Sequence, residues 1–246
     1  MSKLINLIWF FIRITDFIVF SLFMYLLSFA PKALISKTYI NLFQKWCQCF
    51  IQALGIDLAI HQKFLHDLPK QYIVISNHPS AFEDIGMPSA FKAIFLAKSE
   101  VRTWFVLGRI SEAAGTVYVK RDSKESRTQA MLGLGRLLET GHNIGLYPEG
   151  GCKGKRIHLP FYSGAFELSI KYNIPIVPVF LHYEAQDDFV WKNQSLVGKI
   201  WDLLHAKNKR ANYYIHDALY PENFENKDEL MQQTQALYIQ WQQNYL

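Results

Sequence analysis

The sequence predicts an α/β fold in which a mostly parallel central sheet is flanked by helices. Short apolar runs rich in β-branched residues alternate with stretches of helical periodicity from residue 72 onward. The chain has 246 residues, of which 50% are hydrophobic, and this suffices for one large core. Residues 1–30 are almost entirely apolar, so we expect an N-terminal apolar helical membrane anchor before that domain.

The N-terminal segment holds two apolar runs, Leu4–Ile12 and Phe17–Ala30, which Arg13 and Asp16 separate. The second run has 14 residues, fewer than the ~20 that a helix needs to cross a bilayer. A charge inside a joined span costs at least ~2.5 kcal/mol on the insertion scale. We therefore expect an anchor that dips into one leaflet or crosses obliquely and ends at Pro31, in preference to a signal peptide or a buried helix.

A second helix is predicted over Lys37–Leu54, where apolar side chains keep helical spacing and Gly55 is placed to cap the C-terminus. Much of its surface is apolar, so we expect residues 1–55 to form a helical hairpin that anchors the chain in a membrane. A basic and polar link follows. Residues 56–246 are expected to form a single domain, because no linker or low-complexity segment divides them.

Short β-branched or aromatic runs predict the strands of the domain: Tyr72–Ile75, Ala93–Ala97, Thr116–Val119, Asn143–Tyr147, Ile176–Leu181 and Asn212–His216. Helical patterns lie at residues 122–141, 164–172 and 195–206, and from residue 228. Asp122 and Glu125 form a capping-box pattern that predicts the start of the first of these helices. Pro178 has no N–H to donate to a neighbouring strand, so it predicts an edge or bulged position for its strand.

The charge and the cysteines restrict the class of partner. The formal net charge is +5, which suits an anionic partner such as a phospholipid surface or a phosphorylated metabolite. No run of five or more basic residues supports a nucleic-acid-binding tail. Cys47, Cys49 and Cys152 are too few for a disulfide framework or a zinc site, so we expect a reducing compartment and no metal.

The polar stretch Ser76–Asp84 directly follows the predicted strand Tyr72–Ile75. Open α/β sheets place their sites at such strand ends. His78 is the side chain here that takes up a proton near neutral pH, so it is a candidate general base. Either Glu83 or Asp84 could fold back onto the imidazole and fix its tautomer. Taken alone, this stretch favours a histidine that caps a helix or satisfies the core, and the later motifs reverse that preference.

Two further polar clusters follow predicted strands. Arg121, with Lys120 before it, could bind a phosphate through paired N–H donors, although basic residues at strand ends are often merely solvated. Glu149 could accept a hydrogen bond from a substrate hydroxyl. The backbone N–H groups of Gly150 and Gly151 could hold an anion or a developing oxyanion, or the pair could simply form a tight turn.

These clusters and one strand, in this order, resemble the glycerolipid acyltransferase family, the 1-acylglycerol-3-phosphate acyltransferases and their relatives. The family pattern is a His and an acid separated by four residues, then Gly-x-x-Phe-Ile-x-Arg, then Phe-Pro-Glu-Gly-Thr, then an Ile-Val-Pro-Val strand. The similar segments here are His78–Glu83, Gly115–Arg121, Tyr147–Gly151 and Ile176–Val179. The resemblance covers residues 72–182, the motif core of an expected acyltransferase domain at residues 56–246.

Two residues depart from the family pattern. Glu83 stands where the family usually has Asp, and Asp84 follows it. The related lipid A acyltransferases carry Glu there, so the resemblance implies that the chemistry survives the change. Gly151 replaces the usual Thr, which removes a hydroxyl near the head-group site and leaves the acceptor lipid open.

The resemblance implies acyl transfer from a thioester, acyl-ACP or acyl-CoA, to a lipid hydroxyl without a cofactor. His78, held by Glu83, would remove the proton from the acceptor hydroxyl, and the alkoxide would attack the thioester directly. No Ser or Cys lies in an obvious nucleophile elbow, so we expect no acyl-enzyme.

The same resemblance assigns the binding residues. Arg121, with help from Lys120, would bind the acceptor phosphate, while Glu149 and the backbone of Gly150 and Gly151 would position the glycerol. The expected partners are a membrane phospholipid surface and acyl carrier protein or a CoA thioester, with no nucleic acid. The expected location is the cytoplasmic face of the inner or plasma membrane.

Other functions stay open at this point. The same chemistry could act on a lysophospholipid, an ornithine lipid or a lipid A precursor. A non-catalytic lipid-binding protein of the membrane could use the same groove and basic patch without turnover. A nucleic-acid binder rests only on the net charge of +5 and predicts a steep salt dependence of binding.

Overall fold

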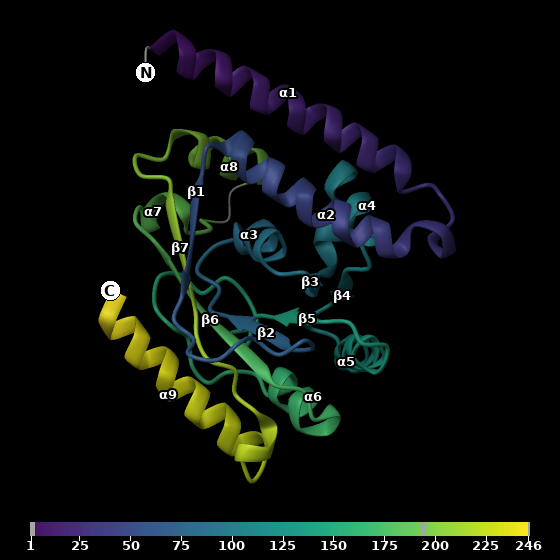
Figure 1. Ribbon diagram of the computed structural model, residues 1–246, viewed down its shortest axis with the longest axis vertical. Helices are drawn as coiled ribbons and strands as arrows, with labels where there is room; N and C mark the ends of the chain where they lie inside the picture. The colour runs from purple at the N-terminus through teal and green to yellow at the C-terminus, as the bar shows by residue number, and fades with distance from the viewer. Residues whose placement is uncertain (1–2, 193–194, 246) are drawn as a thin grey trace.

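A central sheet divides the molecule into two helical layers, as Figure 1 shows for the computed structural model, which describes residues 3–192 and 195–245. Among these residues the strand order is β1-β7-β6-β2-β5-β3-β4. All neighbouring strands are parallel except β6 and β7. The predicted mostly parallel sheet is therefore confirmed. The strands are β1 Asp57–Gln62, β2 Ile73–Ser76, β3 Ile94–Lys98, β4 Val117–Val119, β5 Ile144–Leu146, β6 Ile176–Tyr183 and β7 Arg210–Ile215.

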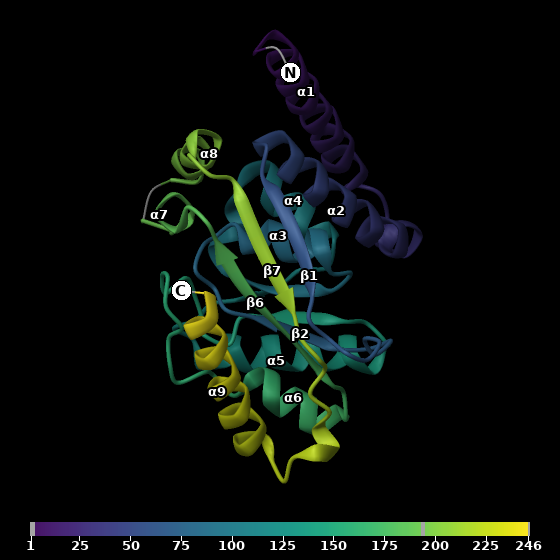
Figure 2. The same cartoon turned by 60° about the vertical axis from the view of Figure 1, so that its left-hand side comes forward.

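Helices cover both faces of the sheet (Figure 2). One hydrophobic core lies on each face. Side chains of α2, α3, α4 and α8 form the core on one face. Side chains of α5, α6 and α9 form the core on the other. The helices are α1 Lys3–Leu27, α2 Lys32–Leu54, α3 Glu83–Ala90, α4 Phe105–Ala113, α5 Lys124–Glu139, α6 Gly164–Tyr172, α7 Gln186–Phe189, α8 Leu196–His205 and α9 Lys227–Tyr245, with 3-10 turns at Ser99–Thr103 and Pro221–Asn223.

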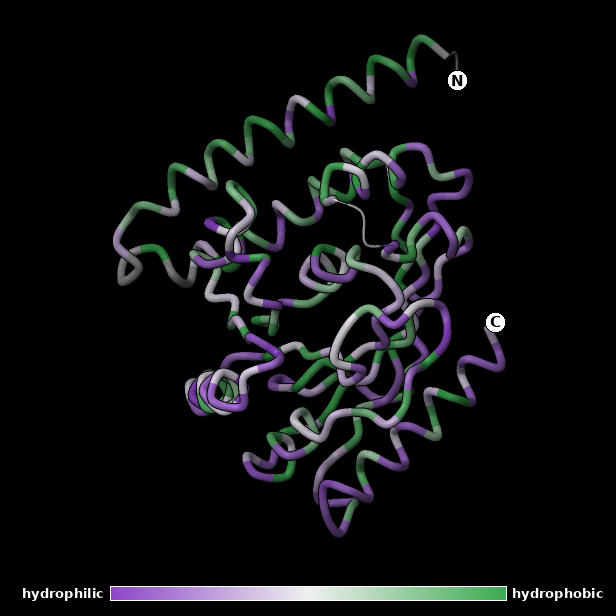
Figure 3. The backbone as a smooth tube through the Cα atoms, turned by 180° about the vertical axis from the view of Figure 1, so that it is seen from behind, coloured by the Kyte–Doolittle hydropathy of each residue, from purple (hydrophilic) through white to green (hydrophobic). Residues whose placement is uncertain are grey.

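The first helix, α1, joins the two apolar runs of the N-terminus into one element. It is long and apolar enough to cross a membrane by length and composition, and only 6% of its most apolar window is buried. Figure 3 shows it as a mostly hydrophobic rod along one side of the domain. The predicted stop at Pro31 was wrong, because α1 ends at Leu27. Pro31 instead precedes α2, where its fixed φ suits the start of a helix.

Aromatic and polar contacts hold α1 against the domain. Phe17 stacks on Phe50 of α2 with ring centroids 4.5 Å apart. At the end of α1, Arg109 of α4 donates hydrogen bonds to the side-chain and backbone oxygens of Ser28, both at 3.2 Å. The same guanidinium lies 4.5 Å from the ring centroid of Phe29. Gly55 caps α2 in the left-handed conformation, φ 68°, as the sequence predicts.

The edge position predicted from Pro178 was wrong. Its strand, β6, lies inside the sheet between β2 and β7. The Pro178 carbonyl accepts a hydrogen bond from the His216 N–H at 3.1 Å, so the ring nitrogen also faces the β7 side. The antiparallel ladder with β7 begins only at Val179, and the parallel ladder with β2 therefore loses no bond to the proline.

Two local predictions also differ from the structure. The cap of α5 is Ser123, whose hydroxyl accepts from the Ser126 N–H at 3.1 Å, and not Asp122. The segment expected as a polar link contains β1, which pairs with β7 along its whole length. This strand is at the sheet edge and half-exposed, so its sequence lacks the continuous apolar run of the central strands.

Candidate functional site

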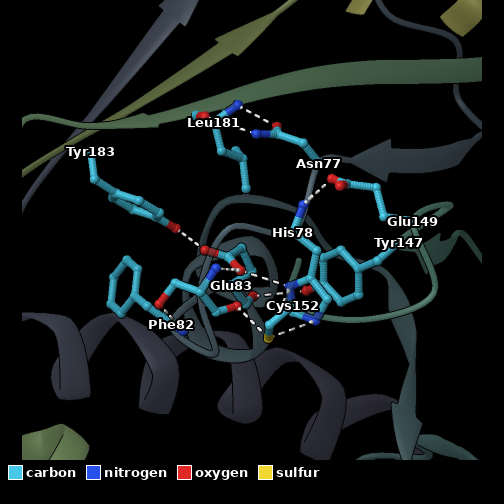
Figure 4. Close-up of polar contacts among 10 residues, drawn as sticks. Asn77, His78, Phe82, Glu83, Tyr147, Glu149, Cys152, Leu181 and Tyr183 are labelled. Atoms are coloured by element: carbon cyan, nitrogen blue, oxygen red, sulfur yellow. Dashed lines mark hydrogen bonds and ion pairs between the residues drawn. The ribbon is translucent and has the colours of Figure 1, made fainter. Parts of the chain in front are cut away.

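The candidate site lies at the carboxyl ends of β2 and β5, where the chain leaves two parallel strands side by side (Figure 4). Asn77, directly after β2, prolongs the contact with β6 through its side chain. Its amide donates to the Leu181 carbonyl at 3.0 Å, and its amide oxygen accepts from the Leu181 N–H at 2.7 Å. These bonds fix the backbone on which His78 follows.

His78 and Glu83 form a buried dyad. The Nδ1 atom of His78 lies 2.7 Å from Oε2 of Glu83. The residue His78 is 3% exposed and Glu83 is 0% exposed. The same Oε2 accepts from the Ser80 N–H at 2.8 Å, at the entry to α3. An Nδ1–H donated to the carboxylate leaves Nε2 as the free base, which is the tautomer needed to take a proton from a substrate hydroxyl.

Two tyrosines fix the dyad from opposite sides. Tyr147 of the β5 loop stacks on the His78 ring, with centroids 4.1 Å apart and an interplanar angle of 14°. Its hydroxyl donates to the backbone carbonyl of Glu83 at 2.9 Å. Tyr183 at the end of β6 donates its hydroxyl to Oε1 of Glu83. Asp84 is half-buried nearby, but the direct contact with the imidazole is made by Glu83.

Glu149 supports the site through the backbone. Its Oε1 accepts from the N–H of His78 at 2.7 Å, and its Oε2 accepts from the N–H of His158 at 2.9 Å. The residue is 1% exposed, so these two bonds satisfy a carboxylate that burial would otherwise destabilise. It joins the β2 loop to the segment after β5. A direct contact of Glu149 with a substrate hydroxyl stays a prediction.

The predicted cation, Arg121, lies beside Gly151. A Cβ atom added to Gly151 would stand 2.6 Å from Arg121 Nη1, so only glycine leaves the guanidinium where it is. Gly150, at φ 73°, needs the left-handed conformation and lies under the Tyr162 ring. Arg121 is exposed, which leaves its donors accessible. Lys120 is exposed beside it, and its backbone N–H bonds to the Ser126 hydroxyl.

Cys152 adds a thiol that no pattern in the sequence assigned to the site. Its Sγ lies 3.5 Å from His78 Nε2, and the thiol donates to the Ser80 carbonyl at 3.1 Å. Burial raises the pKa of this thiol well above its usual value, and the nearby carboxylates act in the same direction. Cys152 is therefore a neutral neighbour of the imidazole at physiological pH.

Burial dominates the ionisation of the dyad. It lowers the pKa of His78, which favours the neutral imidazole required of a base. It raises the pKa of Glu83 to about 8, while the hydrogen bonds from Tyr183 and Ser80 act in the opposite direction. Burial also raises the pKa of Glu149, against the two backbone N–H groups that bond to it. Perturbed groups that converge at a strand end are typical of catalytic sites.

An apolar cavity adjoins the dyad on the side of α2, α3, α4 and α8. It reaches Phe82 and Asp84 beside the site. Lys199 is a buried cation in its wall, and its ammonium donates to the carbonyls of Asp188 and Val190 at 2.7 and 2.8 Å. Burial lowers the pKa of Lys199 to about 8. The rest of the cavity wall includes the apolar side chains of Phe50, Ile85, Phe91, Trp104, Leu107 and Ile200.

Of the residues predicted from sequence, His78, Glu83, Arg121, Glu149 and Gly151 meet in one place. No role was predicted for Asn77 or Tyr183, because their partners lie 104 and 100 residues away in the sequence. Lys199 belongs to no short motif, and its role in the cavity wall depends on the fold. Within residues 3–192 and 195–245, no group of three or more His, Cys, Asp or Glu side chains is arranged to hold a metal ion.

Comparisons with known proteins show that this chain is similar to acyltransferases. A family model described as acyltransferase matches residues 59–182. A 1-acyl-sn-glycerol-3-phosphate acyltransferase of Neisseria gonorrhoeae is 29% identical over 133 residues, 54% of this chain and 52% of that protein. A lyso-ornithine lipid O-acyltransferase of Rhodobacter capsulatus is 24% identical over 197 residues, 75% of this chain and 69% of that protein. This chain thus spans about half the length of the first relative.

A solved structure shares the fold. The crystal structure of the 1-acyl-sn-glycerophosphate (LPA) acyltransferase PlsC from Thermotoga maritima superposes with a TM-score of 0.69 at 16% identity, over 94% of this chain and 97% of that one. The family model covers the β2 loop, the cation after β4, the glycine pair and most of β6. Because that match extends over about half of the sequence, this chain belongs to the acyltransferase family.

Proposed function

We propose that this protein is an acyltransferase that moves a fatty acyl group from a thioester to the free hydroxyl of 1-acylglycerol-3-phosphate. The observation that carries the proposal is the buried dyad, with His78 Nδ1 at 2.7 Å from Glu83. Phe82 and Asp84, which flank Glu83, line an apolar cavity, and the exposed guanidinium of Arg121 lies beside Gly151. A base, an anion-binding group and an apolar cavity are what the transfer of an acyl chain to a phosphorylated acceptor requires.

The proposed reaction takes place in one displacement. Nε2 of His78 removes the proton from the acceptor hydroxyl while the carboxylate of Glu83 stabilises the imidazolium that forms. The acceptor oxygen bonds to the thioester carbonyl carbon, and the C–S bond breaks as the tetrahedral intermediate collapses. The proton on Nε2 passes to the departing thiolate. This returns the dyad to its starting state and releases an ester and a free thiol.

The acceptor is proposed from the cation and the glycine below it. Arg121 can bind a phosphate through two N–H donors, and its place over Gly151 is available because no side chain stands there. A second candidate acceptor is a lyso-ornithine lipid, whose head group has no phosphate. The relative with that activity matches 75% of this chain, a larger share than the match to the Neisseria enzyme.

The donor and the location belong to the same proposal. Either acyl-ACP or acyl-CoA supplies a thioester, and the apolar cavity beside the dyad would take the acyl chain. We infer that α1 holds the protein on a membrane, because its apolar side chains are largely exposed. We place the domain on the cytoplasmic face, where these thioesters are made. Residues 1–55 then form the anchor, and residues 56–246 form the transferase domain.

The experiment is a product analysis with the purified protein in phospholipid vesicles. Lysophosphatidic acid and lyso-ornithine lipid are supplied together, first with acyl-CoA and then with acyl-ACP, and the acylated lipids are measured by mass spectrometry. We expect phosphatidic acid to dominate, and His78→Ala to lose it. Acylated ornithine lipid as the main product would favour the second acceptor. Lipid binding without any acylated product would establish the non-catalytic carrier.

A further inference from the structure

Tyr183 is joined to the dyad although it lies far from it in the sequence. The carboxylate of Glu83 receives donors on both of its oxygens: Oε2 accepts from His78 and from the Ser80 N–H, at 2.7 and 2.8 Å. Oε1 accepts from the Tyr183 hydroxyl. The carboxylate thus bridges the loop after β2 and the end of β6 (Figure 4).

The geometry points to Tyr183 as a positioning residue that adapts this site to a glutamate in place of an aspartate. We propose that its hydroxyl eases the ionisation of Glu83 and aims the carboxylate at Nδ1 of His78. This inference rests on the proposed acyl transfer and adds a residue to its machinery.

The phenol is held rigidly enough for this role. The Tyr183 ring stacks on Phe189, with centroids 4.3 Å apart and an interplanar angle of 6°. Phe82 meets the same ring edge-on, with centroids 6.0 Å apart. The backbone of Tyr183 is paired with β7 through the register with Ala211. A donor fixed by packing on three sides loses little conformational entropy when it bonds to the carboxylate.

The surroundings of Glu83 make such a donor necessary. The residue is 0% exposed, and Phe82 and Tyr183 are also buried. A buried anionic oxygen without a partner costs several kcal/mol, which is relieved by protonation of the carboxylate. A protonated Glu83 could not accept the Nδ1–H of His78 and stabilise the imidazolium. The Tyr183 hydrogen bond lowers the pKa of Glu83, against the effect of burial.

The length of the glutamate is what allows both contacts. An aspartate at the same backbone position is shorter by one C–C bond, about 1.5 Å. Its carboxylate could not hold the present distances to both His78 and Tyr183, which approach from different strands. Tyr183 therefore matters because residue 83 is Glu, and its contribution should shrink when residue 83 is shortened.

The first test compares Tyr183→Phe with the wild type in the full-length protein in vesicles. We expect kcat to fall about tenfold, the loss of one hydrogen bond to a charged group, with KM for both substrates unchanged within about twofold. The acidic limb of the kcat–pH profile should move to higher pH, because the carboxylate becomes harder to ionise. The matched control is Tyr238→Phe, which also removes a buried phenolic hydroxyl, one bonded to the carbonyls of Ile75 and Val179.

A double-mutant cycle with Glu83→Asp sharpens the test. In the Glu83→Asp background, we expect Tyr183→Phe to cost less than about twofold in kcat, because the contact is already lost. A full tenfold loss in that background, or a Tyr183→Phe pH profile that matches those of the wild type and Tyr238→Phe, would overturn the inference.

A spectroscopic measurement separates this inference from the proposed function. With 13Cδ-labelled glutamate, and Glu83→Gln to assign the signal, the Glu83 carboxyl should titrate at higher pH in Tyr183→Phe than in Tyr238→Phe. An unchanged titration overturns the role of Tyr183 even where acyl transfer is active. A shifted titration in a protein that transfers no acyl group to any acceptor would sink the proposed function and leave the coupling of Tyr183 to Glu83 standing.

Discussion

Helix α1 and the loop after β2 depart from the usual distribution of side chains in opposite directions. In α1, apolar side chains face outward: Ile18 is 60% exposed and Phe11 is 59% exposed. In the loop after β2, charged and polar side chains are withdrawn from water, and Glu83 is 0% exposed. The usual rule puts apolar groups inside and leaves charges in water.

The two regions differ in the partners available to these side chains. The buried carboxylates of Glu83 and Glu149 each receive two or more hydrogen bonds from within the protein. Ile18 and Phe11 stay more than half exposed, and the proposed membrane would cover such side chains. The polar groups of the candidate site are thus satisfied inside the domain, whereas the apolar side chains of α1 would be covered by the proposed membrane.

The largest effect is expected at His78. His78→Ala should lower kcat by ~10²–10⁴, because general-base catalysis is lost. The matched control is His182→Ala on β6, a half-buried histidine. Thermal unfolding of both variants checks that the fold survives. Wild-type turnover in His78→Ala would show that the buried region is merely structural.

The next effect separates the two acids. Glu83→Gln should lower kcat about a hundredfold, since the amide cannot stabilise the imidazolium as a carboxylate does. Asp84→Asn should cost less than tenfold, since Asp84 makes no direct contact with the ring comparable to that of Glu83, and tenfold corresponds to about 1.4 kcal/mol. Steady-state assays at a common pH measure both. Equal and mild losses would remove the dyad from the mechanism.

Glu83→Gln should also change stability, and the sign of that change follows from the pKa of Glu83. The pKa of Glu83 is raised from 4.5 to about 8 in the fold, so between these values the folded state binds more protons than the unfolded state. Stability contributed by this group therefore falls as pH rises through that window. Glu83→Gln should melt higher than the wild type at pH 8, by a few degrees, and less so at pH 5. An unchanged difference between the two pH values would contradict the assignment.

A smaller effect is expected at Arg121, the cation beside Gly151. Arg121→Ala should raise the KM for lysophosphatidic acid about tenfold while kcat changes little, because it removes binding to a part of the acceptor that does not react. Arg136→Ala, at an exposed position on α5, serves as the control. If the KM for lyso-ornithine lipid rises equally, Arg121 does not recognise the phosphate of the acceptor.

The smallest effect on the chemistry is expected in α1. Ile18→Lys places a charge in the apolar span and should reduce recovery in the membrane fraction, at a cost of roughly 3 kcal/mol on the insertion scale. In detergent micelles that contain both substrates, kcat should stay within about twofold of wild type. Ile60→Lys, on the edge strand β1, provides the control. Unchanged membrane recovery of Ile18→Lys would break the contrast between the two regions.

The sequence indicated the parts of the site that are local. His78 and Glu83 are five residues apart, and a β-branched run predicts the strand before them. A single turn is therefore enough to bring their side chains into contact. Tyr183 is 100 residues away from Glu83, and no local pattern predicts which tyrosine of a strand reaches it. The sequence predicts Glu149 as an acceptor for a substrate hydroxyl, but its bonds to two backbone N–H groups depend on the loops that fold around it.

The fold was predictable to a similar extent. Buried parallel strands have continuous apolar runs and were found, whereas the half-exposed β1 has none and was missed. The strand of Pro178 was wrongly expected at an edge, because proline is generally found in edge strands. An interior strand accepts proline where the ring nitrogen faces a position without a ladder hydrogen bond, and here the ladder with β7 begins only at Val179.

The contact of Arg109 with Ser28 has a consequence for orientation. Because Arg109 of α4 bonds to Ser28 at the end of α1, the orientation of α1 is linked to that of the domain. With α1 immersed in lipid, every copy of the protein would present its reaction centre to the leaflet at the same height and tilt. Substrate that diffuses in the plane of the membrane would then meet the site in one fixed orientation. The protein would not have to rotate before a productive encounter.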